Sequence, residues 1–237
     1  MPVPANHNRL LALLPEEDYQ YLVTQAETVS LRQLAEVYPA DSPIDSVYFP
    51  LTMVASILTG SGRSQEVEMA IVGNEGMLGS SVILGIPRSF GRTLVQVAGT
   101  ALKLPINLLY AHMERRPVLR TLLTRFLRTL IRHMMQAGAC NLLHNMQERC
   151  ARWLLLMRDC IGQDTFRLTQ QILADMIGVR RATVNLTLGI FKRTGLVSYT
   201  RGRIQILDRA GLKAVSCPCY TSIAAEYQRL RSDMTPL

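Results

Sequence analysis

The fold of this chain is decided by residues 169–188, which read TQQILADMIGVRRATVNLTL. Three positions in this stretch suit two short helices joined by a tight turn. Ala174 is small where two helices must touch, Gly178 allows the positive φ that the turn needs, and Val184 packs the second helix onto the first. The spacing predicts a helix-turn-helix whose second helix begins near Arg180.

The residues that follow predict a β-hairpin beside the second helix. Gly195 is a stop signal for that helix. Residues 196–199 and 203–207 then have the composition of two strands, and Arg201-Gly202 lies between them. A hairpin in this place is a wing, so the sequence predicts a winged helix-turn-helix.

This arrangement predicts which side chains touch DNA. Arg181 suits guanine and Asn185 suits adenine, because both would project from the start of the helix that enters the major groove. Lys192, Arg201 and Arg203 suit phosphates, which position a protein without specifying sequence. The full set of predicted DNA contacts is Thr169, Gln170, Gln171, Arg180, Arg181, Thr183, Asn185, Lys192, Arg201 and Arg203.

The charge distribution also indicates a polyanionic partner. The 237 residues carry a net charge of +8. Residues 1–116 have 8 Lys/Arg against 11 Asp/Glu, residues 117–144 have 4 Arg and no acid, and residues 145–237 have 14 Lys/Arg against 7 Asp/Glu. A basic excess in the last third of a chain favours double-stranded DNA as the partner, and the simpler alternative is a solvated basic surface.

The composition indicates in which compartment the protein lies and whether its cysteines are reduced. The longest charge-free stretch of the first half, residues 46–62, is interrupted by Pro50, Gly60 and Gly62, so we expect no membrane span. We see no secretory signal, and we expect a cytoplasmic protein with five reduced cysteines. Cys217 and Cys219 could form a thiol switch or half of a metal site, but incidental thiols are the simpler interpretation, and we predict no metal.

The first half of the chain predicts a sheet domain. Residues 8–31 have apolar residues at helical spacing, broken by Pro15, and predict short helices. Short β-rich runs follow at residues 46–49, 53–58, 66–72, 93–97 and 101–104, with turn signals between them. Closely spaced short strands of this kind predict a sandwich or a rolled barrel.

A long amphipathic helix is predicted after Pro117. One stripe of this helix steps by four and three residues in turn, which is the spacing of a two-stranded coiled-coil seam. The stripe consists of Leu119, Leu123, Phe126, Leu130, His133, Ala137 and Cys140. We interpret it as a homodimer seam, and the alternative is that the stripe packs on the sheet of the same chain.

The order of these parts resembles the family of the cyclic-AMP receptor protein and the fumarate-nitrate reduction regulator (Crp/Fnr). Specific likeness lies in residues 168–178, 181–184, 195–197, 201–208 and 217–220. The resemblance implies an α+β fold with a cyclic-nucleotide-binding-like β-roll (jelly roll) at residues 1–116, a dimerisation helix at 117–144, a winged helix-turn-helix at 145–216 and a C-terminal extension at 217–237. It implies a transcriptional regulator that binds a pseudo-palindromic operator as a homodimer, with RNA polymerase as a further partner.

Some family positions are altered in this sequence. The nucleotide pocket of the family has a Gly-Glu pair and an Arg-Ser or Arg-Thr pair, which correspond here to Gly79-Ser80 and Arg92-Thr93. Ser80 cannot accept hydrogen bonds from a ribose as a carboxylate does, so we expect no cyclic nucleotide cofactor and leave the effector open. No cysteine precedes Cys140, which excludes the family's N-terminal iron–sulfur cluster.

Two rival functions follow from the same sequence. The first is an enzyme that uses an N-terminal cavity, for which Glu66 and Glu68 are the nearest approach to a catalytic carboxylate pair. We find no Ser-His-Asp arrangement and no phosphate-binding glycine loop, so we predict that the chain is not an enzyme. The second rival is a protein that coats DNA without sequence preference.

Overall fold

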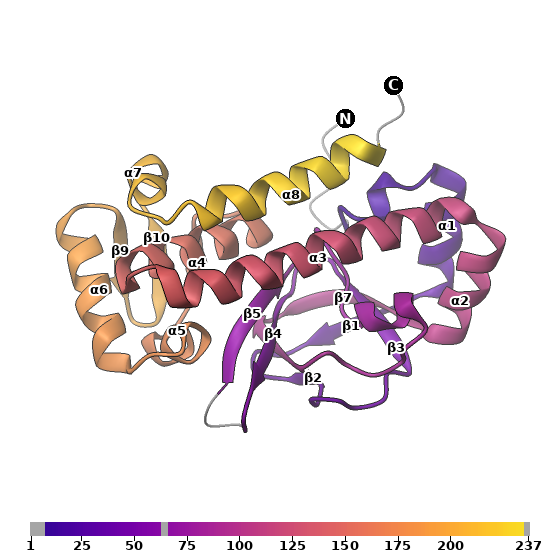
Figure 1. The fold of residues 1–237 in the computed structure, drawn as a ribbon, viewed down its shortest axis with the longest axis horizontal. Coiled ribbons are helices and arrows are strands. Elements are labelled where there is room, and N and C mark those ends of the chain that lie inside the picture. Colours follow the sequence, from indigo (N-terminus) through magenta and orange to yellow (C-terminus); the bar gives the residue numbers. More distant parts are fainter. Residues whose placement is uncertain (1–7, 63–65, 235–237) are drawn as a thin grey trace.

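The computed structural model describes residues 8–62 and 66–234, and a long helix runs through the molecule between a strand-rich unit and a helical unit (Figure 1). The strand-rich unit begins with the 3-10 turn η1 (Leu11–Leu13) and helix α1 (Glu16–Gln25). Its strands are β1 (Glu27–Leu31), β2 (Glu36–Tyr38), β3 (Ser46–Pro50), β4 (Val54–Gly60), β5 (Glu66–Val72), β6 (Arg92–Val97) and β7 (Gly99–Pro105). The turn η2 (Ser80–Leu84) lies between β5 and β6, and α2 (Ile106–Arg115) ends the unit.

The strands form the predicted β-roll from two antiparallel sheets. Their orders are β1-β7-β3 and β2-β6-β4-β5. The strands predicted in residues 46–104 are confirmed with small shifts at their ends. Residues 27–31 are predicted to be helical but form β1, because the β-branched Thr28 and Val29 favour extended backbone and β7 offers a free edge with which β1 pairs.

Helix α3 (Pro117–Leu143) packs on the roll of its own chain. Pro117 is its first residue, a position at which the backbone N–H has no partner within the helix, so its absence in proline costs no hydrogen bond. Gly76 of the roll approaches α3 so closely that a Cβ there would lie 2.7 Å from the ring of Phe126. The helix ends before Asn145, whose side chain accepts a hydrogen bond from the Glu148 backbone N–H at 3.1 Å and so starts helix α4 (Met146–Ile161).

Helix α8 (Cys219–Met234) runs beside α3 in the opposite direction (Figure 1). Glu226 of α8 forms ion pairs with Arg128 Nη1 at 3.4 Å and with Arg132 Nε at 3.8 Å. The hydroxyl of Tyr227 lies 3.3 Å from Nδ1 of His133. The segment that the sequence predicts only as a C-terminal extension is therefore a helix that covers one face of α3.

The predicted dimer seam is covered within a single chain. Its side chains Leu119, Leu123, Phe126, Leu130, His133 and Ala137 are all at most 3% exposed. The roll covers part of this stripe, which is the alternative that the sequence left open, and α8 covers the rest, which the sequence did not predict. A second copy of the chain would therefore have to bind at another surface.

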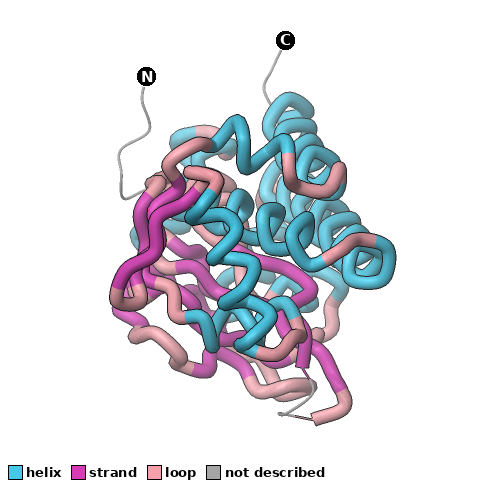
Figure 2. Tube along the Cα trace, turned by 90° about the vertical axis from the view of Figure 1, so that its left-hand side faces the viewer, coloured by secondary structure: helices cyan, strands magenta, loops and turns pink. Residues whose placement is uncertain are grey.

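The helical unit contains the predicted helix-turn-helix and wing. After α4 come β8 (Thr165–Arg167), α5 (Gln170–Ile177), α6 (Arg181–Arg193), β9 (Val197–Thr200), β10 (Arg203–Ile206) and α7 (Arg209–Ala214). The strands form a small antiparallel sheet in the order β8-β10-β9. Viewed from the end of the molecule formed by this unit, helices gather at the upper right and strands lie mainly to the left and below (Figure 2).

The two units share apolar packing. Trp153 of α4 is 1% exposed and belongs to a cluster that includes Leu58 and Ile71 of the roll. The helical unit is thus docked on β4 and β5 through buried side chains. Of the helices described here, none has the length and apolar character needed to cross a membrane.

Candidate nucleic-acid interface

The turn between α5 and α6 has the geometry that the sequence predicts. Gly178 has φ +72°, in the left-handed region that favours glycine. Ala174 and Val184 are fully buried where the two helices touch, and the Val179 N–H donates to the Ala174 carbonyl at 3.0 Å. The Thr169 hydroxyl accepts from the Ile172 N–H at 3.1 Å and so begins α5. This local chemistry fixes how α6 projects from the unit.

One face of α6 is exposed and carries the predicted base-reading side chains. Arg181 and Asn185 are one helical turn apart, and both are exposed. Gln170 Nε2 of α5 donates to Asn185 Oδ1 at 3.1 Å. This bond orients the Asn185 amide and leaves its NH₂ group available to a base edge. α5 therefore helps to position a side chain of α6.

The predicted basic contacts are exposed and free of acidic partners. Within residues 8–62 and 66–234, no ion pair is formed by Arg180, Arg181, Lys192, Arg201 or Arg203. Two other arginines of the helical unit differ in this respect. Arg158 and Arg209 bind Asp159. The helix-turn-helix and the wing thus carry exposed positive charge without acidic partners, as phosphate binding requires.

The wing adds a basic residue that sequence reasoning missed. Arg201 and Gly202 both have positive φ, +48° and +74°, as a two-residue hairpin turn between β9 and β10 requires. On the other side of β10, Arg167 of β8 lies directly opposite Arg203. Two exposed like charges at opposite positions repel each other unless an anion lies between them. The run Arg167-Leu168-Thr169 has no sequence pattern typical of a strand, so only the pairing of β8 with β10 shows that Arg167 lies beside Arg203.

Leu186 is a second residue of this face that the prediction omits. Its side chain is 70% exposed, on the same face of α6 as Ala182 one turn earlier. Apolar side chains at such positions suit the methyl group of thymine. The exposure of Leu186 was predictable from the sequence, because helical periodicity that buries Val184 places Leu186 on the exposed face.

The predicted effector residues do not form one pocket. Gly79, Ser80 and Thr93 line a cavity of only about 10 Å³ in the roll. Arg92 is the neighbour of Thr93 on β6, and its side chain lies on the opposite face of the sheet, since side chains alternate along a strand. There the Arg92 guanidinium binds Glu66, with Nη2 2.5 Å from Oε2, and reaches Glu36 at 3.4 Å.

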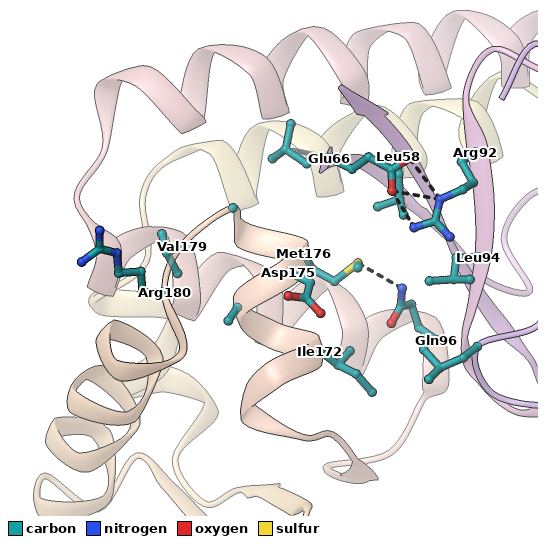
Figure 3. A pocket seen from close by; sticks show the side chains of 14 residues that line it. Leu58, Glu66, Arg92, Leu94, Gln96, Ile172, Asp175, Met176, Val179 and Arg180 are labelled. Carbon is teal, nitrogen blue, oxygen red and sulfur yellow. Dashed lines mark hydrogen bonds and ion pairs between the residues drawn. The ribbon is translucent and has the colours of Figure 1, made fainter. Parts of the chain in front are cut away.

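A larger cavity lies between the roll and α5 (Figure 3). Its volume is about 690 Å³, within the range of small-molecule sites. The bound pair Arg92 and Glu66 forms one wall, and Gln96 Nε2 on the same wall donates to Met176 Sδ of α5 at 3.0 Å. Arg180 lies at the other side, where α6 begins (Figure 3). This cavity therefore touches both the roll and the helix-turn-helix.

The two acidic residues considered for catalysis have separate environments. Glu66 is held by Arg92, whereas Glu68 is buried and accepts a hydrogen bond from the Ser56 hydroxyl. Burial raises the pKa of Glu68 to about 7, although Ser56 and the charge of Arg152 oppose the shift. Neither carboxylate has the open, paired setting of a catalytic site. The geometry of the exposed α6 face and wing instead defines a winged helix-turn-helix protein of the DNA-binding class.

Comparisons with known proteins agree with this geometry. Residues 148–215 match the family model described as a Crp-like helix-turn-helix domain. FixK2 from Bradyrhizobium japonicum matches 81% of this chain and 98% of its own at 17% identity, with a TM-score of 0.67. A Crp/Fnr-family transcriptional regulator from Thermus thermophilus matches 80% and 98% at 22% identity, with a TM-score of 0.64. The c-di-GMP-responsive global regulator CLP from Xanthomonas campestris matches 82% and 100% at 11% identity, with a TM-score of 0.66.

Comparison with curated protein sequences gave no match. Each of these solved structures is matched over nearly its whole length. The chain therefore carries a Crp-like helix-turn-helix domain within the fold of the Crp/Fnr transcriptional regulators. This confirms the predicted α+β fold class and the resemblance on which it drew.

Proposed function

We propose that this protein is a sequence-specific transcriptional regulator that binds a pseudo-palindromic DNA site as a homodimer and acts on RNA polymerase. The observation that carries the proposal is the exposed α6 face, on which Arg181 and Asn185 project without acidic partners beside the basic wing. An α6 helix in the major groove would present both side chains to base edges. Arg201, Arg203 and Arg167 would then lie near phosphates.

The first experiment selects bound fragments from sheared genomic DNA with the purified protein at fixed salt. A shared two-fold motif, with half-sites roughly 34 Å apart, supports the proposal. Fragments without a motif, together with a steep salt dependence, would favour the rival that coats DNA without sequence preference.

Arg181→Ala tests the assigned base contact. We expect the affinity for the selected site to fall by about 5-fold to 150-fold, which corresponds to ~1–3 kcal/mol, and one base position to become relaxed. The matched control is Arg120→Ala, which removes the same charge from an exposed position on α3 and should leave the affinity unchanged. An equal loss on selected and random DNA would make Arg181 a phosphate contact instead.

The homodimer would use a different stripe of α3 from the one that the sequence indicated. Ile131, Met135 and Leu142 are 43%, 61% and 88% exposed, and they step by four and seven residues. This spacing again matches a coiled-coil seam, but on the face that the roll and α8 leave open. We therefore place the proposed dimer contact on the second half of α3.

Met135→Glu tests that contact, because a charge in an apolar seam loses its hydration. The expected result is a shift from twice the chain mass to the chain mass in sedimentation equilibrium, with helix content unchanged. Met135→Leu is the control and should remain dimeric. A Met135→Glu protein that keeps the dimer mass would place the contact elsewhere.

We also propose that the roll does not bind a cyclic nucleotide. A cavity of about 10 Å³ has room for about one water molecule, and Arg92 is already held by Glu66. Calorimetric titration with cyclic AMP should give no saturable heat. The cavity between the roll and α5 is the better candidate for an effector site, since a ligand there would touch both units.

A further inference from the structure

Three buried cysteines meet where α3 ends and α8 begins. Cys140 lies in the last turn of α3, Cys217 precedes α8, and Cys219 is its first residue. Their Sγ atoms all lie within 4.8 Å of one another, and Cys140 Sγ is 3.4 Å from Cys217 Sγ. Each side chain is at most 2% exposed. The sequence showed only the close pair, because the third thiol is 77 residues away from Cys217.

We propose that Cys140, Cys217 and Cys219 bind a thiophilic divalent metal ion, such as zinc or cadmium, as three thiolates. Binding converts three S–H groups into three metal–sulfur bonds and releases three protons. Neither metal nor sulfur changes oxidation state, so no oxidant is required. A fourth coordination position would remain for water or a small external ligand.

The sulfur separations fit a metal better than a disulfide. A tetrahedral ion with metal–sulfur bonds of about 2.3 Å sets its sulfur atoms about 3.8 Å apart. The observed separations, 3.4 Å for one pair and up to 4.8 Å for the group, lie on both sides of that value. A disulfide needs a sulfur separation of about 2.05 Å and would leave one of the three thiols unused.

Two features around Cys219 favour negative charge on its sulfur. Gln136 Nε2 donates to Cys219 Sγ at 3.1 Å, as outer-sphere donors do around metal thiolates. Cys219 also lies at the N-terminal end of α8, where the helix dipole favours negative charge. These two features act on the same sulfur from different elements.

A buried arginine supplies the counter-charge. The side chain of Arg152 is largely enclosed, with the residue 4% exposed, and its Nε has no hydrogen-bond partner in the described part of the chain. The positive charge of Arg152 acts on Cys140 and on Cys217. Three thiolates and a divalent ion carry a net charge of −1, which the guanidinium can balance. The inference therefore rests on three converging buried thiols beside a buried cation, and it does not depend on DNA binding.

The test is a titration of the full-length protein with Cd²⁺ under a phosphine reductant, followed by its thiolate-to-metal ultraviolet absorption. We expect saturation at one ion per chain and displacement by Zn²⁺. Cys217→Ser and Cys219→Ser should each weaken binding by at least about 100-fold, and Gln136→Leu by about 10-fold. The control Cys160→Ser removes a thiol in the last turn of α4 that contacts Glu75, and this variant should bind like the wild type.

A measurement on the wild type guards against variants that fail to fold. In moderate urea, bound Zn²⁺ should protect Cys140, Cys217 and Cys219 from alkylation while Cys160 still reacts, as peptide mass mapping would show. Absence of saturable Cd²⁺ absorption would overturn the proposal, as would unchanged binding by Cys217→Ser. Formation of a Cys140–Cys217 disulfide by peroxide in a protein that takes up no Cd²⁺ would also overturn it, in favour of a thiol switch.

Discussion

Replacing Glu68 by glutamine should change how the stability of the protein depends on pH. Glu68 of β5 is 6% exposed, and burial raises its pKa from the ordinary 4.5 to about 7. In the unfolded chain the same carboxyl group ionises near pH 4.5. Between these two values the unfolded chain has lost a proton that the folded protein keeps, so the free energy of unfolding falls as the pH rises.

The size of this fall follows from the shift. A difference of about 2.5 pKa units at ~1.4 kcal/mol per unit gives about 3 kcal/mol between pH 4.5 and 7. His133 makes the free energy of unfolding rise with pH instead, because burial and then the charge of Arg152 lower its pKa to about 3. Its contribution rises with pH between about 3 and 6.5 and masks the effect of Glu68 in the wild type.

The assay is therefore a difference between two proteins. Urea unfolding of the wild type and of Glu68→Gln is measured from pH 4 to 8, so the His133 contribution cancels. We expect the stability of the wild type relative to the variant to fall by about 3 kcal/mol across this range. The control Glu114→Gln, exposed on α2, should show a flat difference. A flat difference for Glu68→Gln would refute the reasoning and show that Arg152 keeps the buried carboxylate ionised.

Two further predictions concern stability. Leu130→Ala removes a fully buried side chain of α3 and should lower the free energy of unfolding in urea by about 2–5 kcal/mol without changing the oligomeric mass. Loss of a dimer in this variant would mean that Leu130 lies in the dimer contact after all. Gly178→Ala should lower the free energy of unfolding by about 1–2 kcal/mol, as thermal unfolding would show, because alanine disfavours the positive φ of this turn. The added Cβ itself has room, since it would lie 3.5 Å from Val67 Cγ2. An unchanged unfolding midpoint would mean that the backbone of the turn changes its conformation.

Local patterns in the sequence predicted the elements that depend on near neighbours. The α5–α6 turn was predictable because Ala174, Gly178 and Val184 each have one geometric role within eleven residues. The strand at residues 66–72 was predicted at its observed bounds because turn signals enclose it. Arg92 and Thr93 could also have been separated in advance, since adjacent residues of a strand face opposite sides of the sheet.

Long-range packing was not predictable in the same way. Helix α3 has two stripes with coiled-coil spacing, one through Leu130 and one through Met135, and nothing local shows which stripe the same chain covers. The answer depends on α8, whose contacts with α3 join residues about 80 to 110 positions apart, such as Gln136 with Cys219 and Arg125 with Asp233. The cysteine cluster was hidden for the same reason.

The position of α8 has a consequence for how the protein is made. Leu230 belongs to the apolar cluster of the roll, and Tyr220 and Ile223 belong to that of the helical unit, so both cores contain side chains from the final helix. A ribosome synthesises this helix after the rest of the described chain, and folding on the ribosome proceeds from the N-terminus. Until α8 has emerged from the ribosome, the apolar side chains of α3 that it covers remain exposed to solvent. The nascent chain should therefore bind chaperones most readily in that interval.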